Sequence, residues 1–124
     1  MSVSLTFQQS TGLVTDSAGE VVAHAWAGNG EGLNNPAMQA VRCVGPLPQG
    51  TYRVGTWEEQ HPGLGPMVVH LQQIAGETFG RDGFYIHGPS STHYMQESKG
   101  CVVVPHEQRQ KIHDLDPDFL VVVA

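Results

Sequence analysis

Basic residues are scarce in this chain of 124 residues, which has six Lys and Arg against twelve Asp and Glu. The formal net charge is −6, and no local cluster of Lys or Arg offsets it. Because this average field repels a phosphate backbone, nucleic acid is excluded as a partner.

Long apolar runs are also missing. No stretch approaches the roughly 18 to 20 apolar residues that a membrane-spanning helix needs, so we expect no membrane span. The first seven residues, MSVSLTF, alternate like a strand and lack a basic segment followed by an apolar one. This pattern predicts a protein made in the cytoplasm without a secretory signal peptide.

Cysteine occurs only twice, as Cys43 and Cys101. A cytoplasmic origin favours free thiols over a disulfide, and we expect the two sulfurs not to meet. Cys43 stands between Arg42 and Val44, where we expect a small buried apolar residue. Cys101 has different neighbours, which are considered below with His87.

Charged residues make up only 15% of the chain and hydrophobic residues 40%, a balance typical of a compact domain. The 15 glycines and 8 prolines predict many turns, which favours strands over long helices. A chain of this length suits one core, so we expect a single domain over residues 1–124. The predicted fold is mainly β, a sandwich or barrel with one short C-terminal helix.

The predicted helix starts at Pro105, a residue suited to a first helical turn, and runs to about Leu115 with His106, Arg109 and Lys111 facing solvent. Residues 16–19 predict a turn that joins the first two strands as a hairpin. Residues 28–50 are expected to form a loop with one short helical turn. Strands are predicted at residues 4–8, 21–27, 51–57, 67–74, 84–87, 101–104 and 119–123.

His87 and Cys101 stand where apolar strands meet glycine-bearing loops. A thiol with a free pKa of about 8.5 is mostly protonated at neutral pH, and a neighbouring imidazole can take its proton. We therefore predict Cys101 as a nucleophile with a lowered pKa and His87 as its base. Gly100 would let a substrate carbonyl approach, the N–H groups of Gly100 and Cys101 would bind an oxyanion, and Ser98 would cap the turn or orient the carbonyl.

Three segments resemble the successive motifs of L,D-transpeptidase-like domains, namely GPLPQGTY at 45–52, GRDGFYIHG at 80–88 and SKGC at 98–101. They are closest to the small branch that includes type VI secretion effectors attacking peptidoglycan. Residues 10–13 and 34–39 also fit that branch, so the similarity covers nearly the whole chain. The His-Gly and Ser-x-Gly-Cys elements in this order are its most specific parts.

The sequence departs from the large L,D-transpeptidases in three places. The loop between His87 and Ser98 is shorter, Lys99 stands where they usually carry His, and residues 102–105 replace polar residues that often follow the Cys. These departures concern the exact substrate and the balance between transfer and hydrolysis.

The resemblance implies an L,D-transpeptidase-like fold in which Cys101 is the nucleophile and His87 the base, with Ser98 and Gly100 shaping the site. It also implies substrate binding by Gly88, Tyr52 and Arg109, with Arg109 at the substrate carboxylate. No metal and no organic cofactor are needed.

The substrate implied by the resemblance is a cell-wall tetrapeptide with a diamino acid at its third position. Cys101 would form a thioester there and expel the terminal D-alanine, and water or an amine would resolve the thioester. The same resemblance implies an antibacterial effector that secretion machinery delivers to the periplasm of a target bacterium. Such an effector implies a cognate immunity protein.

Three other interpretations remain open from the residues alone. His87, His93, Cys101 and His106 are residue types that bind zinc, although their spacing matches no tight ligand pair. A phage or cell-wall-binding β domain without enzyme activity would use the 28–50 loop for binding. A papain-like protease is disfavoured because here the His precedes the Cys.

Overall fold

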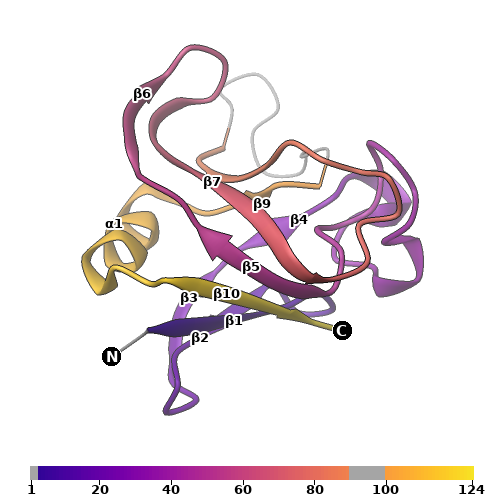
Figure 1. The fold of residues 1–124 in the computed structure, drawn as a ribbon, viewed down its shortest axis with the longest axis horizontal. Coiled ribbons are helices and arrows are strands. Elements are labelled where there is room, and N and C mark those ends of the chain that lie inside the picture. The colour runs from indigo at the N-terminus through magenta and orange to yellow at the C-terminus, as the bar shows by residue number, and fades with distance from the viewer. Residues whose placement is uncertain (1–2, 90–99) are drawn as a thin grey trace.

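The computed structural model describes residues 3–89 and 100–124. The ten strands of the described chain form one strongly curved sheet, whose strands follow the order β3-β2-β1-β10-β5-β7-β8-β9-β4, with β6 paired to β7 off this path (Figure 1). The strands are β1 Ser4–Gln8, β2 Leu13–Thr15, β3 Val21–His24, β4 Trp26–Ala27, β5 Gly50–Val54, β6 Glu58–His61, β7 Gly65–Gly76, β8 Phe84–His87, β9 Val102–Val103 and β10 Phe119–Val123.

The two ends of this path nearly close the sheet into a barrel. β3 and β4 lie at opposite ends of the strand order, yet only Ala25 separates them in the sequence. A sheet whose first and last strands are joined in this way must curl round on itself, which removes most of its open edge. The predicted fold class, mainly β and sandwich- or barrel-like with one C-terminal helix, is confirmed.

The N-terminal and C-terminal strands pair with each other. β1 runs parallel to β10 with Ser4 opposite Phe119 and Gln8 opposite Val123, and β10 pairs antiparallel with β5 on its other side. Alternate residues of β1 and β10 face inward, which explains the alternating sequence of residues 4–8.

The opening differs from the predicted hairpin. The turn at residues 16–19 joins β2 to β3, and β1 pairs with β2. The expected strand at 21–27 divides at Ala25 into β3 and β4, because the chain leaves one edge of the sheet there and joins the other. The loop at 28–50 holds two short 3₁₀ turns, η1 Gly30–Gly32 and η2 Pro36–Met38, rather than one.

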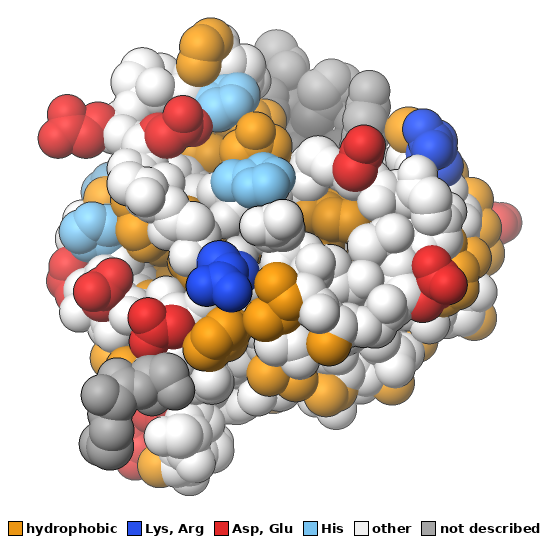
Figure 2. All heavy atoms as spheres, viewed as in Figure 1, with side chains coloured by type: hydrophobic (Ala, Val, Ile, Leu, Met, Phe, Trp, Pro, Cys, Tyr) orange, Lys and Arg blue, Asp and Glu red, His pale blue; other side chains and the backbone are white. Residues whose placement is uncertain are grey.

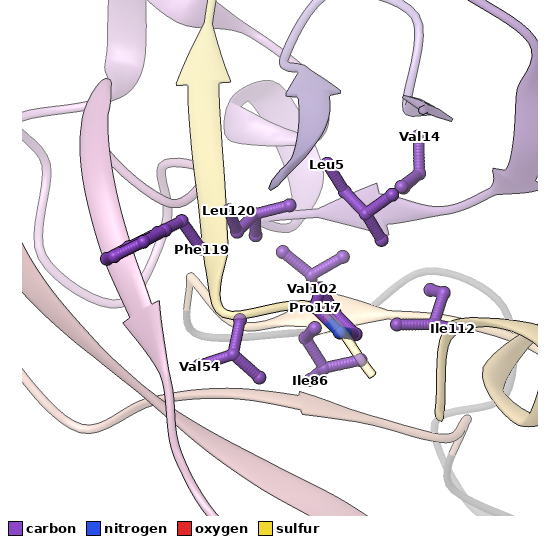
Figure 3. A pocket seen from close by; sticks show the side chains of 9 residues that line it. All are labelled: Leu5, Val14, Val54, Ile86, Val102, Ile112, Pro117, Phe119 and Leu120. Carbon is purple, nitrogen blue, oxygen red and sulfur yellow. The ribbon is translucent and has the colours of Figure 1, made fainter. Parts of the chain in front are cut away.

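A single cluster of buried apolar side chains fills the barrel and includes residues from Leu5 to Val122. Figure 3 shows part of it, where side chains from β1, β8, β9, β10 and the helix converge on a residual gap of about 10 Å³. Ile86 of β8 and Val102 of β9 point into this core. The neighbouring residues of β8 and β9 therefore face the other side of the sheet.

The helix α1, His106–Leu115, lies against β3 at one side of the barrel (Figure 1). It follows Pro105 and ends at Asp116, which has a left-handed conformation with φ of 50°. The predicted end at Leu115 is confirmed, whereas the helix begins one residue after the predicted start, with Pro105 as its N-cap. Among the described residues no helix is long and apolar enough to cross a membrane.

Candidate active site

The pairing of β8 with β9 places His87 and Cys101 on one face of the sheet. The two strands are parallel, with Ile86 opposite Val102 and His87 opposite Val103, and the Val104 N–H donates to the His87 carbonyl at 2.9 Å. Since Ile86 and Val102 face the core, His87 and Cys101 face away from it as diagonal neighbours. The order His-then-Cys on adjacent strands thus places both side chains on one face, and their role as a catalytic pair stays a prediction.

Cys101 is 8% exposed, and its thiol lies 3.6 Å from the Gly83 carbonyl, to which it donates. Burial raises the pKa of this thiol to about 11, while a backbone N–H of Tyr85 and the Arg81 guanidinium act in the opposite direction. The expectation of a lowered thiol pKa is therefore wrong for this conformation, because loss of hydration outweighs the nearby donors.

His87 is positioned to accept a proton. Its Nδ1 lies 2.7 Å from the Gly88 carbonyl, and since a carbonyl can only accept, Nδ1 carries the hydrogen and Nε2 has the lone pair. Burial lowers the pKa of His87. The hydrogen bond to Gly88 raises this pKa, whereas the charges of Arg109 and His61 lower it further. Both pKa shifts favour the uncharged forms, a neutral Cys101 thiol and a neutral His87 imidazole.

Gly100 precedes the nucleophile at φ of +115°, a conformation that favours glycine. A Cβ there would overlap the Arg81 guanidinium. The Arg81 side chain donates from Nη1 to the carbonyls of Gln39 and Pro46, the latter at 2.8 Å, and from Nη2 to that of Gly45 at 2.9 Å. The Arg81 hydrogen bonds therefore hold the loop at 39–46 in place beside Gly100 and Cys101.

Arg81 was not singled out by the sequence. Its partners are backbone carbonyls 35 to 42 positions away, which leave no mark in the local pattern. Its position directly before the Asp82-Gly83 turn and the Phe84 strand is the only local signal.

A second buried arginine lies beside His87. Arg109 is 3% exposed, so its predicted solvent-facing position is wrong. Arg109 Nη1 donates to the Val104 carbonyl at 2.8 Å and Nη2 to the Pro66 carbonyl at 3.4 Å, while its Nε has no partner among the described residues. Arg109 precedes buried Ile112 by three residues and so shares its face of α1, a periodicity that identifies its burial from the sequence. We assign it a positioning role.

Gly88 lies against this arginine, because a Cβ at position 88 would overlap the Arg109 guanidinium. Gly88 and Gly100 thus adjoin His87 and Cys101 respectively, and each makes room for a buried arginine.

Tyr52 lies in the core rather than at the surface of the site. It is 0% exposed, its hydroxyl donates to the Pro48 carbonyl at 2.8 Å, and burial raises its pKa. Its ring meets that of Phe84 edge-on, with centroids 6.0 Å apart. Tyr52 therefore joins β5 to the start of β8, and the structure does not bring it to a substrate.

Ser98 lies outside the described residues, as does His93 of the zinc alternative. Within residues 3–89 and 100–124 there is no group of three or more His, Cys, Asp or Glu side chains that could hold a metal ion.

Cys43 is exposed rather than buried, so its assignment to packing is wrong. It has a left-handed backbone with φ of 64°, and its carbonyl accepts from Asn29 Nδ2 at 2.7 Å. Both cysteines are free, as predicted, yet both line one pocket of about 220 Å³. The two cysteines therefore share a pocket, although the sequence predicted that they lie apart.

A second, larger hollow of about 470 Å³ lies between β6, β7 and α1. Its lining includes Trp57, Glu58, Glu59, His106 and His113. Figure 2 shows acidic and histidine side chains gathered on the side of β6 and α1, with few Lys and Arg side chains on this face. Next to it the Tyr85 ring contacts the rings of His61 and His70, at centroid distances of 5.2 and 5.1 Å.

The fold is that of L,D-transpeptidases. The structure is similar to an L,D-transpeptidase from Xylanimonas cellulosilytica DSM 15894, with a TM-score of 0.63 over 98% of this chain at 17% identity. An L,D-transpeptidase from Mycobacterium tuberculosis H37Rv gives 0.64 over 99% at 17% identity. The helical cell shape determining protein Pgp2 from Campylobacter jejuni gives 0.61 over 98% at 14% identity. The chain spans only 60%, 58% and 46% of these three chains, respectively.

A family model described as the Tlde1 domain matches residues 21–116, a stretch that contains both His87 and Cys101. Because the match takes in most of the sequence, the chain belongs to the Tlde1 domain family, the type VI secretion effectors of the L,D-transpeptidase kind. No curated protein sequence matches the chain significantly.

Proposed function

We propose that the protein is a peptidoglycan-modifying cysteine acyltransferase or peptidase, an L,D-transpeptidase and L,D-carboxypeptidase acting on cell-wall tetrapeptides. The observation that carries the proposal is the His87 tautomer. Its Nδ1–H is held by the Gly88 carbonyl at 2.7 Å, which leaves Nε2 as a base on the same face as the Cys101 thiol. The family match and the fold support the same chemistry.

In the proposed mechanism, the Cys101 sulfur attacks the acyl carbon of the diamino acid at the third position while His87 Nε2 takes the thiol proton. The backbone N–H groups of Gly100 and Cys101 stabilise the oxyanion. The C–N bond then breaks, His87 returns its proton to the departing amine of D-alanine, and a thioester remains on Cys101. Water, deprotonated by His87, hydrolyses the thioester and restores the thiol. An amine in place of water yields a cross-link or an exchanged D-amino acid.

The pair needs no preformed thiolate. Since burial raises the pKa of Cys101 and lowers that of His87, the charged pair arises only as the sulfur attacks. This protects the thiol from unrelated electrophiles and makes the substrate part of the activation.

The biological setting follows from the family. We propose that the protein is an antibacterial effector whose substrate lies in the periplasm of a target bacterium. Its partners would be a peptidoglycan stem peptide, the secretion machinery that delivers it and a cognate immunity protein that covers the site.

The test is mass spectrometry of purified muropeptides after incubation with the protein. Loss of the terminal alanine from tetrapeptides, or its exchange for an added D-amino acid, is expected. Cys101→Ala should abolish the reaction and His87→Ala should slow it by roughly a hundred-fold or more, whereas Cys43→Ala should retain it. Unchanged muropeptides with the folded wild-type protein would favour a cell-wall-binding domain without enzyme activity.

A further inference from the structure

The pocket that Cys101 lines has charges of both signs on its wall. It measures about 220 Å³ and is lined by Arg42, Cys43, Arg81, Asp82, Gly83 and Cys101. His87 is not among the described residues that line it. A group bound in this pocket therefore adjoins Cys101.

The two arginines in the pocket differ in how they are used. Arg81 is buried, and its two Nη atoms donate to the carbonyls of Gln39, Gly45 and Pro46. Arg42 is exposed and donates from Nη2 to the Gly80 carbonyl at 2.7 Å. Among the described residues Arg42 has no carboxylate partner within 4.0 Å, Asp82 included.

The segment that carries Arg42 is held on both sides. The Arg81 bonds fix the carbonyls of Gln39 and Gly45, and Asn29 holds the Cys43 carbonyl at 2.7 Å. The Arg42 bond to Gly80 fixes one edge of the guanidinium itself. A binding group whose surroundings are already ordered loses little further freedom when a ligand arrives.

We propose that this pocket holds the carboxylate-bearing amino acid on the leaving side of the scissile bond, with Arg42 at its carboxylate. The inference rests on the proposed function and adds a specificity-determining residue to it. A guanidinium binds a carboxylate through paired charge-assisted hydrogen bonds, which a carboxamide cannot replace. Asp82 provides the complementary charge, because the amine released with the His87 proton takes up a further proton from water and becomes an ammonium group.

A binding experiment tests this without turnover, because Cys43 lines the same pocket and is exposed. In a Cys101→Ala background Cys43 is the only thiol, and its alkylation by iodoacetamide reports occupancy. We expect D-alanine to slow alkylation several-fold and D-alaninamide, at matched ionic strength, to leave it unchanged. Arg42→Gln should remove the protection, and Arg53→Gln, at an exposed site on β5, should keep it. Cys101→Ser serves the same purpose if Cys101→Ala does not fold.

Equal protection by D-alanine and its amide, or no protection by either, would overturn the assignment of Arg42. So would protection that survives Arg42→Gln.

The kinetic counterpart compares a tetrapeptide that ends in a carboxylate with its C-terminal carboxamide. The wild-type protein should favour the carboxylate by about tenfold or more in kcat/KM, and Arg42→Gln should lower kcat/KM for the carboxylate by that factor while leaving the carboxamide unchanged. An equal loss on both substrates contradicts the inference. If the wild-type protein acts on neither, the proposed function fails, and the alkylation experiment still decides whether the pocket recognises a carboxylate.

Discussion

The guanidinium of Arg109 fills the space that a side chain at position 88 would need. Through its bonds to the Val104 and Pro66 carbonyls, this arginine ties the segment after β9 to the start of β7, directly beside the base. The need for glycine at position 88 of the His-Gly motif is therefore explained by close packing against Arg109, as well as by any role toward substrate.

Replacing Gly88 with Ala should displace Arg109 and lower the free energy of unfolding by about 1–3 kcal/mol. Gly88 is not in the left-handed region, so the loss comes from overlap alone. Gly63→Ala is the matched control, since a Cβ there meets only the His61 ring at 3.7 Å. Urea denaturation measures both variants. In an Arg109→Met background the loss from Gly88→Ala should shrink, and an undiminished loss would show that Arg109 is not the obstacle.

The two thiols should react with iodoacetamide at very different rates in the folded protein. Cys43 is exposed, whereas Cys101 is 8% exposed with its pKa raised to about 11, so thiolate is scarce and shielded at pH 7.5. Peptide mass mapping after brief labelling should find the adduct on Cys43. Cys43→Ser should leave one slowly reacting thiol and retain activity. Faster labelling of Cys101 would mean that the site has an activated thiolate before substrate binds.

Stability should depend on His87 in mildly acidic solution. The unfolded chain takes up a proton at this residue near pH 6.5, whereas burial lowers its pKa in the folded protein. Below pH 6.5 the unfolded state therefore binds more protons than the folded state. As the pH is lowered, the free energy of unfolding decreases by up to about 1.4 kcal/mol per pH unit, until His87 also titrates in the folded protein. The difference in free energy of unfolding between wild type and His87→Asn, measured by denaturation, should be constant above pH 6.5 and change below it. The exposed His24, replaced by Asn, provides the control, and parallel curves for wild type and His87→Asn would contradict the assigned environment.

Arg81 should not be replaceable by lysine. In Arg81→Lys a single ammonium group would have to donate to the three carbonyls that the guanidinium now binds. We therefore expect the free energy of unfolding to fall by about 1–3 kcal/mol. Arg53→Lys, on the exposed face of β5, should change stability by less than about 0.5 kcal/mol. Differential scanning calorimetry distinguishes the two. A lysine variant as stable as the wild type would show that the loop at 39–46 is held by other contacts.

Segments with clear periodicity were predicted with correct bounds, as for β1, β8 and β10, and α1 begins one residue later than predicted. β6, Glu58–His61, was missed because its polar sequence has no apolar alternation and its pairing with β7 alone makes it a strand. β2 was missed because three residues are too few for a pattern.

At the site, the sequence predicted His87 and Cys101 because each stands at a strand end next to glycine, and the structure places both on one face of the sheet. The sequence predicted the exposure of Cys43 and Arg109 wrongly. The exposure of Cys43 depends on the loop that carries it, and that of Arg109 on which face of α1 packs against the sheet. Neither property is set by the nearest neighbours in the sequence.

The position of β10 has a consequence for synthesis on the ribosome. This strand, Phe119–Val123, lies in the middle of the sheet between β1 and β5, although it follows every other strand in the chain. Until it leaves the exit tunnel, β1 and β5 have no common neighbour, and the barrel that supports β8 and β9 is incomplete. A nascent chain would therefore carry both His87 and Cys101 before the barrel around β8 and β9 is complete.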